Sequence, residues 1–425
     1  MERRAFIVKP LHKVIFWTHL LAGGTAGSII FLMCATGVIL MYEPQLSEFS
    51  ERDARRVVPS ADGERLSYNE LRARVRATIP QARPAMMVLK SDPTASVTMN
   101  LGRETVFVDP YNGRILGRFS ATHDFLRAIV DWHRWLGVEG EGRATARAIT
   151  GACNLAFFWL AVSGIYLWWP RNWRSRGLKN SLVLNPRLRG KARDWNWHNA
   201  TGFWSATVLI ILTLTGAVMS YPWVNDLLYT LTGSEPPART QASAPGPEGA
   251  RRARGETQHA RTHASSSAGF DALVNAAQQQ VPGWVTIMMR FPPREGGPVT
   301  ASIQGLDAFH PFQRSQLTLD GNTAAILKWE PYAGNSTGRK LRTWVRALHT
   351  GEAFGLVGQT IAGLASLGGC LLVWTGWAMA WRRYRLWRRL PKDLAAEESL
   401  LAPRGQNTQQ RRAPKRAARS RVSLF

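Results

Sequence analysis

Cysteine is nearly absent from this sequence: Cys34, Cys153 and Cys370 are the only three in 425 residues. Each lies within a long apolar run, so the polar parts of the chain have no disulfide framework, and no C-x-x-C-H motif is present for covalent haem attachment. No motif of a zinc protease, a P-loop nucleotide hydrolase, a G-x-S-x-G hydrolase or a dinucleotide-binding enzyme stands in a supporting context. The sequence therefore indicates none of these enzyme classes.

Acidic residues are also scarce: 29 Asp and Glu stand against 54 Lys and Arg, which gives a formal net charge of +25. The excess is concentrated in residues 1–13, 170–195 and 382–425, which hold 25 basic and five acidic residues. If the apolar runs cross a membrane in alternation, these three segments lie on one side, and the positive-inside rule predicts that both termini are cytoplasmic. Basic segments beside a membrane explain the charge more simply than nucleic-acid binding, so no nucleic-acid partner is expected.

Long apolar runs are what the sequence does contain. Four of them cover residues 14–42, 144–169, 198–221 and 355–381. Each has about 20 residues or more, the length that crosses a bilayer. Many of the 18 tryptophans stand at the ends of these runs, as in an interfacial aromatic belt. The sequence predicts a multi-pass membrane protein, with the first run as an uncleaved signal anchor.

The first and third runs share a pattern. Trp17-Thr18-His19 opens the first, and Trp195-Asn196-Trp197-His198 opens the third. In both, a Thr-Gly pair follows the histidine by 17 and 18 residues, and a tyrosine follows it by 23. The polar segments after these runs are also alike, since their hairpins place Asp109 seven residues before Leu116 and Asp320 seven residues before Leu327. We interpret the chain as an internal duplication.

The predicted fold is an α-helical membrane protein with α+β extracytoplasmic domains. Within the outer segments we expect helices over residues 68–79 and 270–280, and strands over 96–100, 106–109, 285–290, 299–304 and 316–319. The predicted divisions are an N-terminus with the first span (1–42), a first outer domain (43–120), an interfacial helix and second span (121–169), a basic loop (170–197), the third span (198–222), a second outer domain (223–340) with a disordered insert (233–268), an interfacial helix and fourth span (341–381), and a basic tail (382–425).

Four histidines stand at corresponding places before the four runs. His19 and His198 fall near the cytoplasmic face, and His133 and His349 near the outer face, if the spans alternate. A histidine at a span counts as a functional candidate, and two at one depth on different helices supply both axial ligands of a haem. Four residues beyond them are Gly23, Gly202, Gly137 and Ala353, small residues that would leave room for a porphyrin on the same helix face.

Haem suits these histidines better than a single metal ion does. Structural zinc needs four ligands at one point, whereas these histidines fall at two depths, so zinc and copper suit them less well. His12 and His123 are the fallback ligands, and His310 is expected to be a loop residue. Basic side chains that would meet haem propionates are Arg127, Arg134, Arg342, Arg346, Lys13 and Arg193.

Three stretches carry a resemblance to a known family. The outer segments resemble PepSY domains, most closely in Val106-Phe107-Val108-Asp109-Pro110-Tyr111-Asn112-Gly113-Arg114-Ile115-Leu116. His133-Arg134-Trp135-Leu136 and Ser163-Gly164-Ile165-Tyr166-Leu167-Trp168-Trp169-Pro170 are similar to the PepSY-associated transmembrane family. The resemblance covers about residues 10–390, and it departs from the pattern at Gly321-Asn322-Thr323-Ala324 and at the 233–268 insert.

The resemblance implies a bacterial inner-membrane ferrisiderophore reductase, with two bis-histidine haems b held by His19, His198, His133 and His349. The resulting hypothesis is an electron-transfer protein that receives electrons from a separate flavoprotein or quinol and reduces a periplasmic ferric siderophore or other Fe(III) chelate. Two alternatives remain open: a PepSY-type regulatory or binding protein without redox activity, and an electron-transfer subunit for a different periplasmic acceptor.

Overall fold

The computed structural model describes residues 2–59, 63–102, 104–169, 181–237, 269–294 and 296–401, with side chains for residues 10–388 of these ranges. The chain forms two units, residues 1–377 and residues 378–425. Within the second unit, residues 378–401 are helical. Most of the predicted insert, part of the predicted basic loop and the end of the predicted tail lie outside the described residues, at 238–268, 170–180 and 402–425.

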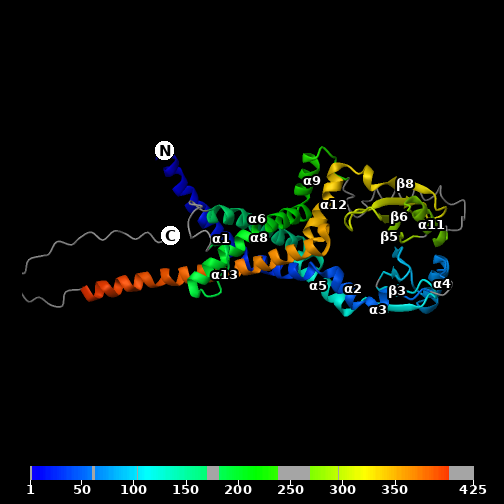
Figure 1. Ribbon diagram of the computed structural model, residues 1–425, viewed down its shortest axis with the longest axis horizontal. Helices are drawn as coiled ribbons and strands as arrows, with labels where there is room; N and C mark the ends of the chain where they lie inside the picture. Colours follow the sequence, from blue (N-terminus) through cyan, green and yellow to red (C-terminus); the bar gives the residue numbers. More distant parts are fainter. Residues whose placement is uncertain are drawn as a thin grey trace, which may run out of the picture. The chain divides into compact units, whose positions relative to one another are not determined.

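Four long helices carry the apolar runs (Figure 1). They are α1 (Glu2–Leu40), α6 (Arg143–Trp168), α8 (Gly190–Ser220) and α13 (Gly355–Leu401). The parts long and apolar enough to cross a membrane are Pro10–Leu40, Gly140–Trp168, Gly190–Ser220 and Glu352–Arg388. A helix long and apolar enough to cross a membrane is therefore present at each of the four predicted spans. The third helix begins eight residues before His198, so this histidine lies within α8 and not at its start.

Small residues allow these helices to pack closely. A Cβ atom at Gly27 of α1 would lie 2.7 Å from Nε1 of Trp377 of α13, and one at Gly369 of α13 would lie 2.6 Å from Sγ of Cys34. Between α6 and α8, Asn154 Nδ2 donates to the Thr213 carbonyl oxygen at 2.8 Å. Such buried side-chain hydrogen bonds join neighbouring helices where lipid offers no polar partner.

Shorter helices connect the four long helices, in sequence, to the segments that contain the strands. They are α2 (Glu43–Ser50), α3 (Arg52–Arg55), α5 (Ala121–Trp135), α9 (Pro222–Leu231) and α12 (Thr337–His349), with 3-10 turns at Gly140–Gly142, Tyr332–Gly334 and Glu352–Phe354. Ser120 and Ser336 cap α5 and α12 by accepting hydrogen bonds from the backbone N–H groups of His123 and Arg339. The two predicted interfacial helices are thus α5 and α12, whereas α2, α3 and α9 were not predicted.

The two segments predicted to be outer domains form one antiparallel sheet of eight strands, in the order β4-β3-β2-β1-β5-β6-β7-β8. The strands are β1 (Met86–Lys90), β2 (Val97–Asn100), β3 (Thr105–Val108), β4 (Ile115–Arg118), β5 (Trp284–Arg290), β6 (Val299–Gly305), β7 (Ser315–Leu319) and β8 (Ile326–Glu330). Strand β1, which was not predicted, pairs with β5 in a register that joins Val88 to Met288. The sheet is therefore continuous across the two outer segments.

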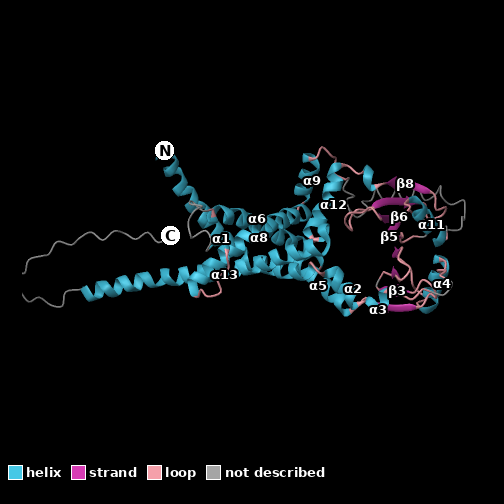
Figure 2. Cartoon of the chain, viewed as in Figure 1, coloured by secondary structure: helices cyan, strands magenta, loops and turns pink. Residues whose placement is uncertain are grey.

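One face of this sheet carries the main hydrophobic core (Figure 2). Helices α4 (Tyr68–Thr78) and α11 (Phe270–Gln280) supply Leu71, Val75 and Val274 to it, all at most 1 % exposed. Alternate residues of the strands, including Leu89 and Ile287 at the centre, complete the same cluster. Both predicted helices are confirmed within one residue.

The two predicted hairpin turns share one hydrogen bond from the backbone to an aspartate. Asp109 accepts from the Tyr111 N–H at 2.8 Å, and Asp320 accepts from the Asn322 N–H at 2.8 Å. Four residues beyond each aspartate the backbone is left-handed, with φ +73° at Gly113 and φ +58° at Ala324. The second turn therefore places a residue with a Cβ atom where glycine is favoured.

Candidate functional site

The structure brings the four candidate histidines together in two pairs. His19 of α1 faces His198 of α8, with ring centroids 6.5 Å apart and planes inclined at 79°. His133 of α5 faces His349 of α12, with ring centroids 6.4 Å apart and planes inclined at 61°. These are the two pairs that the sequence predicts from depth. All four side chains are half-buried.

Every one of the four rings is held at Nδ1 by a hydroxyl group of a neighbouring helix. The bonds are His19–Ser163 at 2.8 Å, His133–Thr36 at 2.9 Å, His198–Thr375 at 2.9 Å and His349–Thr215 at 3.0 Å. The histidines of α1 and α5 bond to α6 and α1, and those of α8 and α12 bond to α13 and α8. The same pattern of contacts thus occurs in each half of the chain.

The hydroxyl groups also define which ring nitrogen carries the proton. Each one donates to the carbonyl oxygen four residues earlier in its own helix, at 2.6–2.7 Å. Its oxygen is then left to accept from the histidine, so Nδ1 is protonated and Nε2 keeps its lone pair. In addition, His349 Nδ1 lies 3.1 Å from the Leu212 carbonyl oxygen, which can only accept. This tautomer is the one that an axial ligand needs.

A glycine follows each of these hydroxyl residues and lies against the histidine ring. Cβ atoms placed at the four glycines would lie 3.3–3.7 Å from ring Cε1, in the pairs Gly37–His133, Gly164–His19, Gly216–His349 and Gly376–His198. A Cβ atom would be in van der Waals contact with the ring at Gly37, Gly164 and Gly376, and only at Gly216 would the contact be tight. The sequence shows these Ser/Thr-Gly pairs, but reasoning from sequence did not connect them with the histidines.

The two pairs lie at different levels of the bundle. On α1, His19 and Thr36 are 17 residues apart, and on α8 the same spacing separates His198 and Thr215. At the helical rise this corresponds to about 25 Å along the axis, most of the thickness of a bilayer core. An apolar cluster that includes Ile30 lies between the levels. Each pair is therefore near one end of the membrane-crossing part.

The histidine pairs fit the dimensions of a bis-histidine haem. Two imidazoles that bind one metal from opposite sides, each at about 2 Å, have ring centroids about 6 Å apart. The separations of 6.5 Å and 6.4 Å agree with this value. Within the described residues no three His, Cys, Asp or Glu side chains gather as for an ion held by protein alone. A macrocycle that supplies its own equatorial ligands needs only the two axial nitrogens present at each level.

The four small residues predicted beside the haem do not share one environment. Gly23 and Gly202 lie within α1 and α8, where Cβ atoms would meet Leu160 at 3.8 Å and Leu372 at 3.5 Å. Gly137 lies beyond the end of α5 with φ +72°, and Ala353 lies beyond the end of α12 in a 3-10 turn. Because α5 and α12 end before Gly137 and Ala353, these two residues do not lie one helical turn beyond their histidines on the same helix face. Their role at a cofactor stays a prediction.

The end of the bundle nearer the sheet is rich in arginine. The Arg134 guanidinium lies 4.5 Å from the Trp135 ring centroid, and that of Arg346 lies 4.5 Å from the Phe312 ring centroid. Arg342 donates to Asn225 at 3.1 Å, so its predicted contact with a haem propionate would compete with this bond. Burial raises the pKa of Glu43 at this end, and the nearby Glu352 raises it further. Arginines and two carboxyl groups, Glu43 and Glu352, thus lie together at this end.

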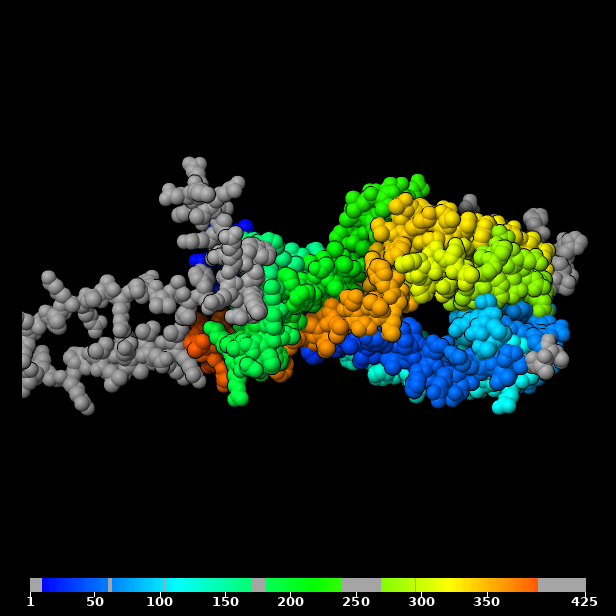
Figure 3. Space-filling model, in the orientation of Figure 1, coloured from blue at the N-terminus to red at the C-terminus, as the bar shows by residue number. Residues whose placement is uncertain are grey.

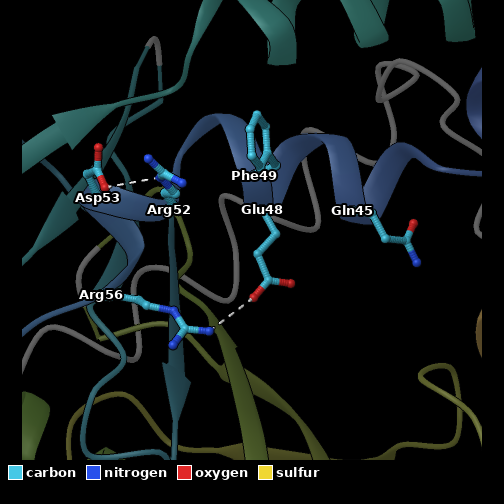
Figure 4. A pocket seen from close by; sticks show the side chains of 6 residues that line it. All are labelled: Gln45, Glu48, Phe49, Arg52, Asp53 and Arg56. Atoms are coloured by element: carbon cyan, nitrogen blue, oxygen red, sulfur yellow. Dashed lines mark ion pairs between the residues drawn. The ribbon is translucent and has the colours of Figure 1, made fainter.

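A cavity of about 590 Å³ lies along α2 and α3 (Figure 4). Its lining residues are Gln45, Glu48, Phe49, Arg52, Asp53 and Arg56. Two ion pairs join its lining residues, Arg52–Asp53 at 3.4 Å and Arg56–Glu48 at 4.0 Å, and Phe49 is 72 % exposed. The volume is within the range of small-molecule sites, about 300–1,000 Å³. Gln45 also donates to Gln359 of α13 at 2.7 Å, which ties the cavity to the bundle.

Four membrane-length helices and an antiparallel sheet with packed helices define the class: a multi-pass helical membrane protein with an α+β domain. The model of the PepSY-associated TM region matches residues 16–383, most of the chain. The protein belongs to this family, as its sequence indicated. No curated protein matches the chain.

Proposed function

We propose that this protein transfers electrons across the bacterial inner membrane, from a cytoplasmic or quinol donor to a periplasmic acceptor, with two b-type haems. The observation that carries the proposal is the repeated histidine geometry: two facing pairs, each ring held at Nδ1 and separated as for two axial ligands. When bound, haem supplies one-electron chemistry by cycling between Fe(III) and Fe(II). Since both axial positions would be occupied by histidine, electron transfer is favoured over oxygen or substrate binding at iron.

The chain's own residues serve this role by fixing the ligands. His19 and His198 would hold one haem, and His133 and His349 the other. The hydroxyl groups of Ser163, Thr375, Thr36 and Thr215 orient the rings and increase the basicity of Nε2. The four helices exclude water from the region between the two levels.

In this proposal both termini are cytoplasmic and the sheet is periplasmic. The reason is that the excess of basic residues lies in the two terminal segments and in the loop between the second and third apolar runs, and such segments face the cytoplasm. The two halves arise from duplication: strands β1–β4 with α4, and β5–β8 with α11, are two PepSY domains that share one sheet. The equivalent histidine contacts in the two halves and the central β1–β5 pairing support this view.

The acceptor is a ferric siderophore or another Fe(III) chelate, and the cavity along α2 and α3 is its binding site. Phe49 there suits the organic shell of a chelate, and Arg52 and Arg56 would bind its anionic groups in exchange for their ion-pair partners Asp53 and Glu48. One electron reduces Fe(III) to Fe(II), which hard oxygen chelators hold less tightly, so the metal is released for uptake. The electron donor is a separate flavoprotein or quinol.

The test is the absorption spectrum of the detergent-purified protein, oxidised in air and then reduced with dithionite, with haem quantified as the pyridine haemochromogen. We expect sharp reduced α and Soret bands and about two haems b per chain, one for each histidine pair. A colourless protein from haem-replete cells would refute the electron-transfer function. A PepSY-type regulatory role without redox activity would then replace it.

A further inference from the structure

Helix α9 carries a stripe of large apolar side chains that no other part of the described chain covers. Trp223, Leu227 and Leu231 are spaced by four residues along one face, and they are 59 %, 46 % and 78 % exposed. Residues at this spacing lie one above the other on a helix. The stripe is therefore continuous over about 12 Å of helix.

The opposite face of α9 is packed against α12. Leu228 and Tyr229 are buried with Val345 of α12, and a Cβ atom at Gly338 of α12 would lie 2.6 Å from the Tyr229 ring. Arg342 of α12 donates to Asn225 at 3.1 Å. These contacts fix the rotation of α9 about its axis, so the apolar stripe must face away from α12.

The position of α9 in the chain places this stripe at the membrane surface. Only Tyr221 separates α9 from the last residue of α8, Ser220, where the third membrane-crossing helix ends. Figures 1 and 3 show that α9 turns away from the direction of α8 and runs beside α12. A short helix with tryptophan and leucine on its free face, directly beyond a span, has the character of an interfacial helix.

We infer that α9 lies in the lipid interface, with Trp223, Leu227 and Leu231 inserted among the outer ends of the acyl chains. Through its bonds to α12, this anchor holds the helix that carries His349 at a constant depth. The occupant of the stripe is the bilayer, since α9 follows directly on α8, a helix long and apolar enough to cross a membrane, on which Leu214 is also exposed, at 48 %. The inference depends on the membrane topology and not on haem binding.

The first test is the collisional accessibility of a spin label on the full chain in liposomes. Leu227→Cys and Leu231→Cys are compared with Leu364→Cys on α13, which is 64 % exposed within a span, and with Val58→Cys after α3, which is 87 % exposed. The unsubstituted chain, labelled in parallel, corrects for the three native cysteines. We expect the α9 labels to favour oxygen over a water-soluble nickel complex, as the Leu364→Cys label does.

Two results would overturn the inference. Preference for the nickel complex, as at Val58→Cys, would mean that the stripe faces water. Low accessibility to both reagents would mean that protein covers it, either a second copy or a partner. As an independent test, Leu227→Glu with Leu231→Glu should increase amide hydrogen exchange in both α9 and α12 in liposomes, whereas Val58→Glu should not. Unchanged exchange in α9 would also contradict lipid insertion.

Discussion

Thr36 of α1 and His133 of α5 are joined by a hydrogen bond of 2.9 Å between Oγ1 and Nδ1. The Thr36 hydroxyl donates in turn to the Leu32 carbonyl oxygen at 2.7 Å. A backbone carbonyl, a hydroxyl and an imidazole thus form a short chain that holds the His133 ring at Nδ1 and leaves the Nε2 lone pair available to a ligand. The other three histidines have equivalent chains, so this relationship is a repeated element of the site and not a local accident.

The Thr36 hydroxyl should tune the haem at the His133–His349 level. Thr36→Val keeps the side-chain shape but removes the acceptor for Nδ1, so we expect haem binding about 10- to 100-fold weaker and a higher midpoint potential, because a less basic ligand stabilises Fe(III) less. Thr36→Ser should restore both properties. Haem transfer to apomyoglobin and a redox titration measure them. Thr25→Val on the same helix, where the hydroxyl bonds only to its own backbone, should change neither.

Substitution of one histidine pair should remove one haem and leave the other. His133→Ala with His349→Ala should lower the pyridine haemochromogen value from about two haems per chain to about one. The control is His123→Ala, on the same helix α5, whose ring stacks on Phe119 at 3.7 Å. If both haem signals survived the double substitution, ligation by these two residues would be excluded.

The pairing of the histidines was predictable from the sequence, but their hydroxyl partners were not. The lengths of the four apolar runs, and the assumption that successive runs cross the membrane in opposite directions, pair His19 with His198 and His133 with His349. The structure contains these two pairs. Which helix packs next to which is a tertiary property. The Ser/Thr-Gly pairs can be recognised in the sequence. That Ser163 of α6 forms a hydrogen bond with His19 of α1 cannot be inferred from it.

The sheet shows a similar limit. Hydrophobic alternation and turn residues located most strands within two residues, and the spacing of apolar residues located helix α4. Strand β1 was missed because Met86–Lys90 lacks the β-branched alternation of its neighbours. Since β1 forms the seam with β5, the continuity of the eight strands was missed with it. Long-range pairing of this kind depends on contacts separated by about 200 residues in sequence.

Close packing at Gly27 should be essential for stability. Gly27→Ala places a Cβ atom 2.7 Å from Nε1 of Trp377, so α1 and α13 must separate locally, at a cost of about 1–3 kcal/mol. Gly24→Ala, three residues earlier on α1, meets nothing within 4 Å and should have little effect. Thermal unfolding followed with a thiol-reactive fluorophore, which reports exposure of Cys34 and Cys153, measures both. Equal melting temperatures for the two variants would contradict this packing.

The cavity along α2 and α3 should affect reduction of the chelate without affecting haem content. Arg52→Ala removes a cation from the lining, and we expect kcat/KM for an anionic Fe(III) chelate to fall about tenfold, which corresponds to about 1.4 kcal/mol. Arg118→Ala is the matched control, since that side chain is 65 % exposed against 63 % for Arg52 and pairs with Glu104. A similar loss in both variants would point to general electrostatic attraction and not to a site at Arg52.

The seam of the sheet should link the stability of the two outer segments. Ile287 of β5 is fully buried and pairs with Leu89 of β1, so Ile287→Ala should lower the free energy of unfolding of the sheet by about 2–5 kcal/mol. Because β1 and β5 share backbone hydrogen bonds and one core, amide hydrogen exchange should rise in β1 and β2 as well as in β5 and β6. The control, Ile326→Ala on the edge strand β8, removes a side chain that is 50 % exposed and should change little. Faster exchange restricted to β5–β8 would mean that the two segments unfold as independent domains.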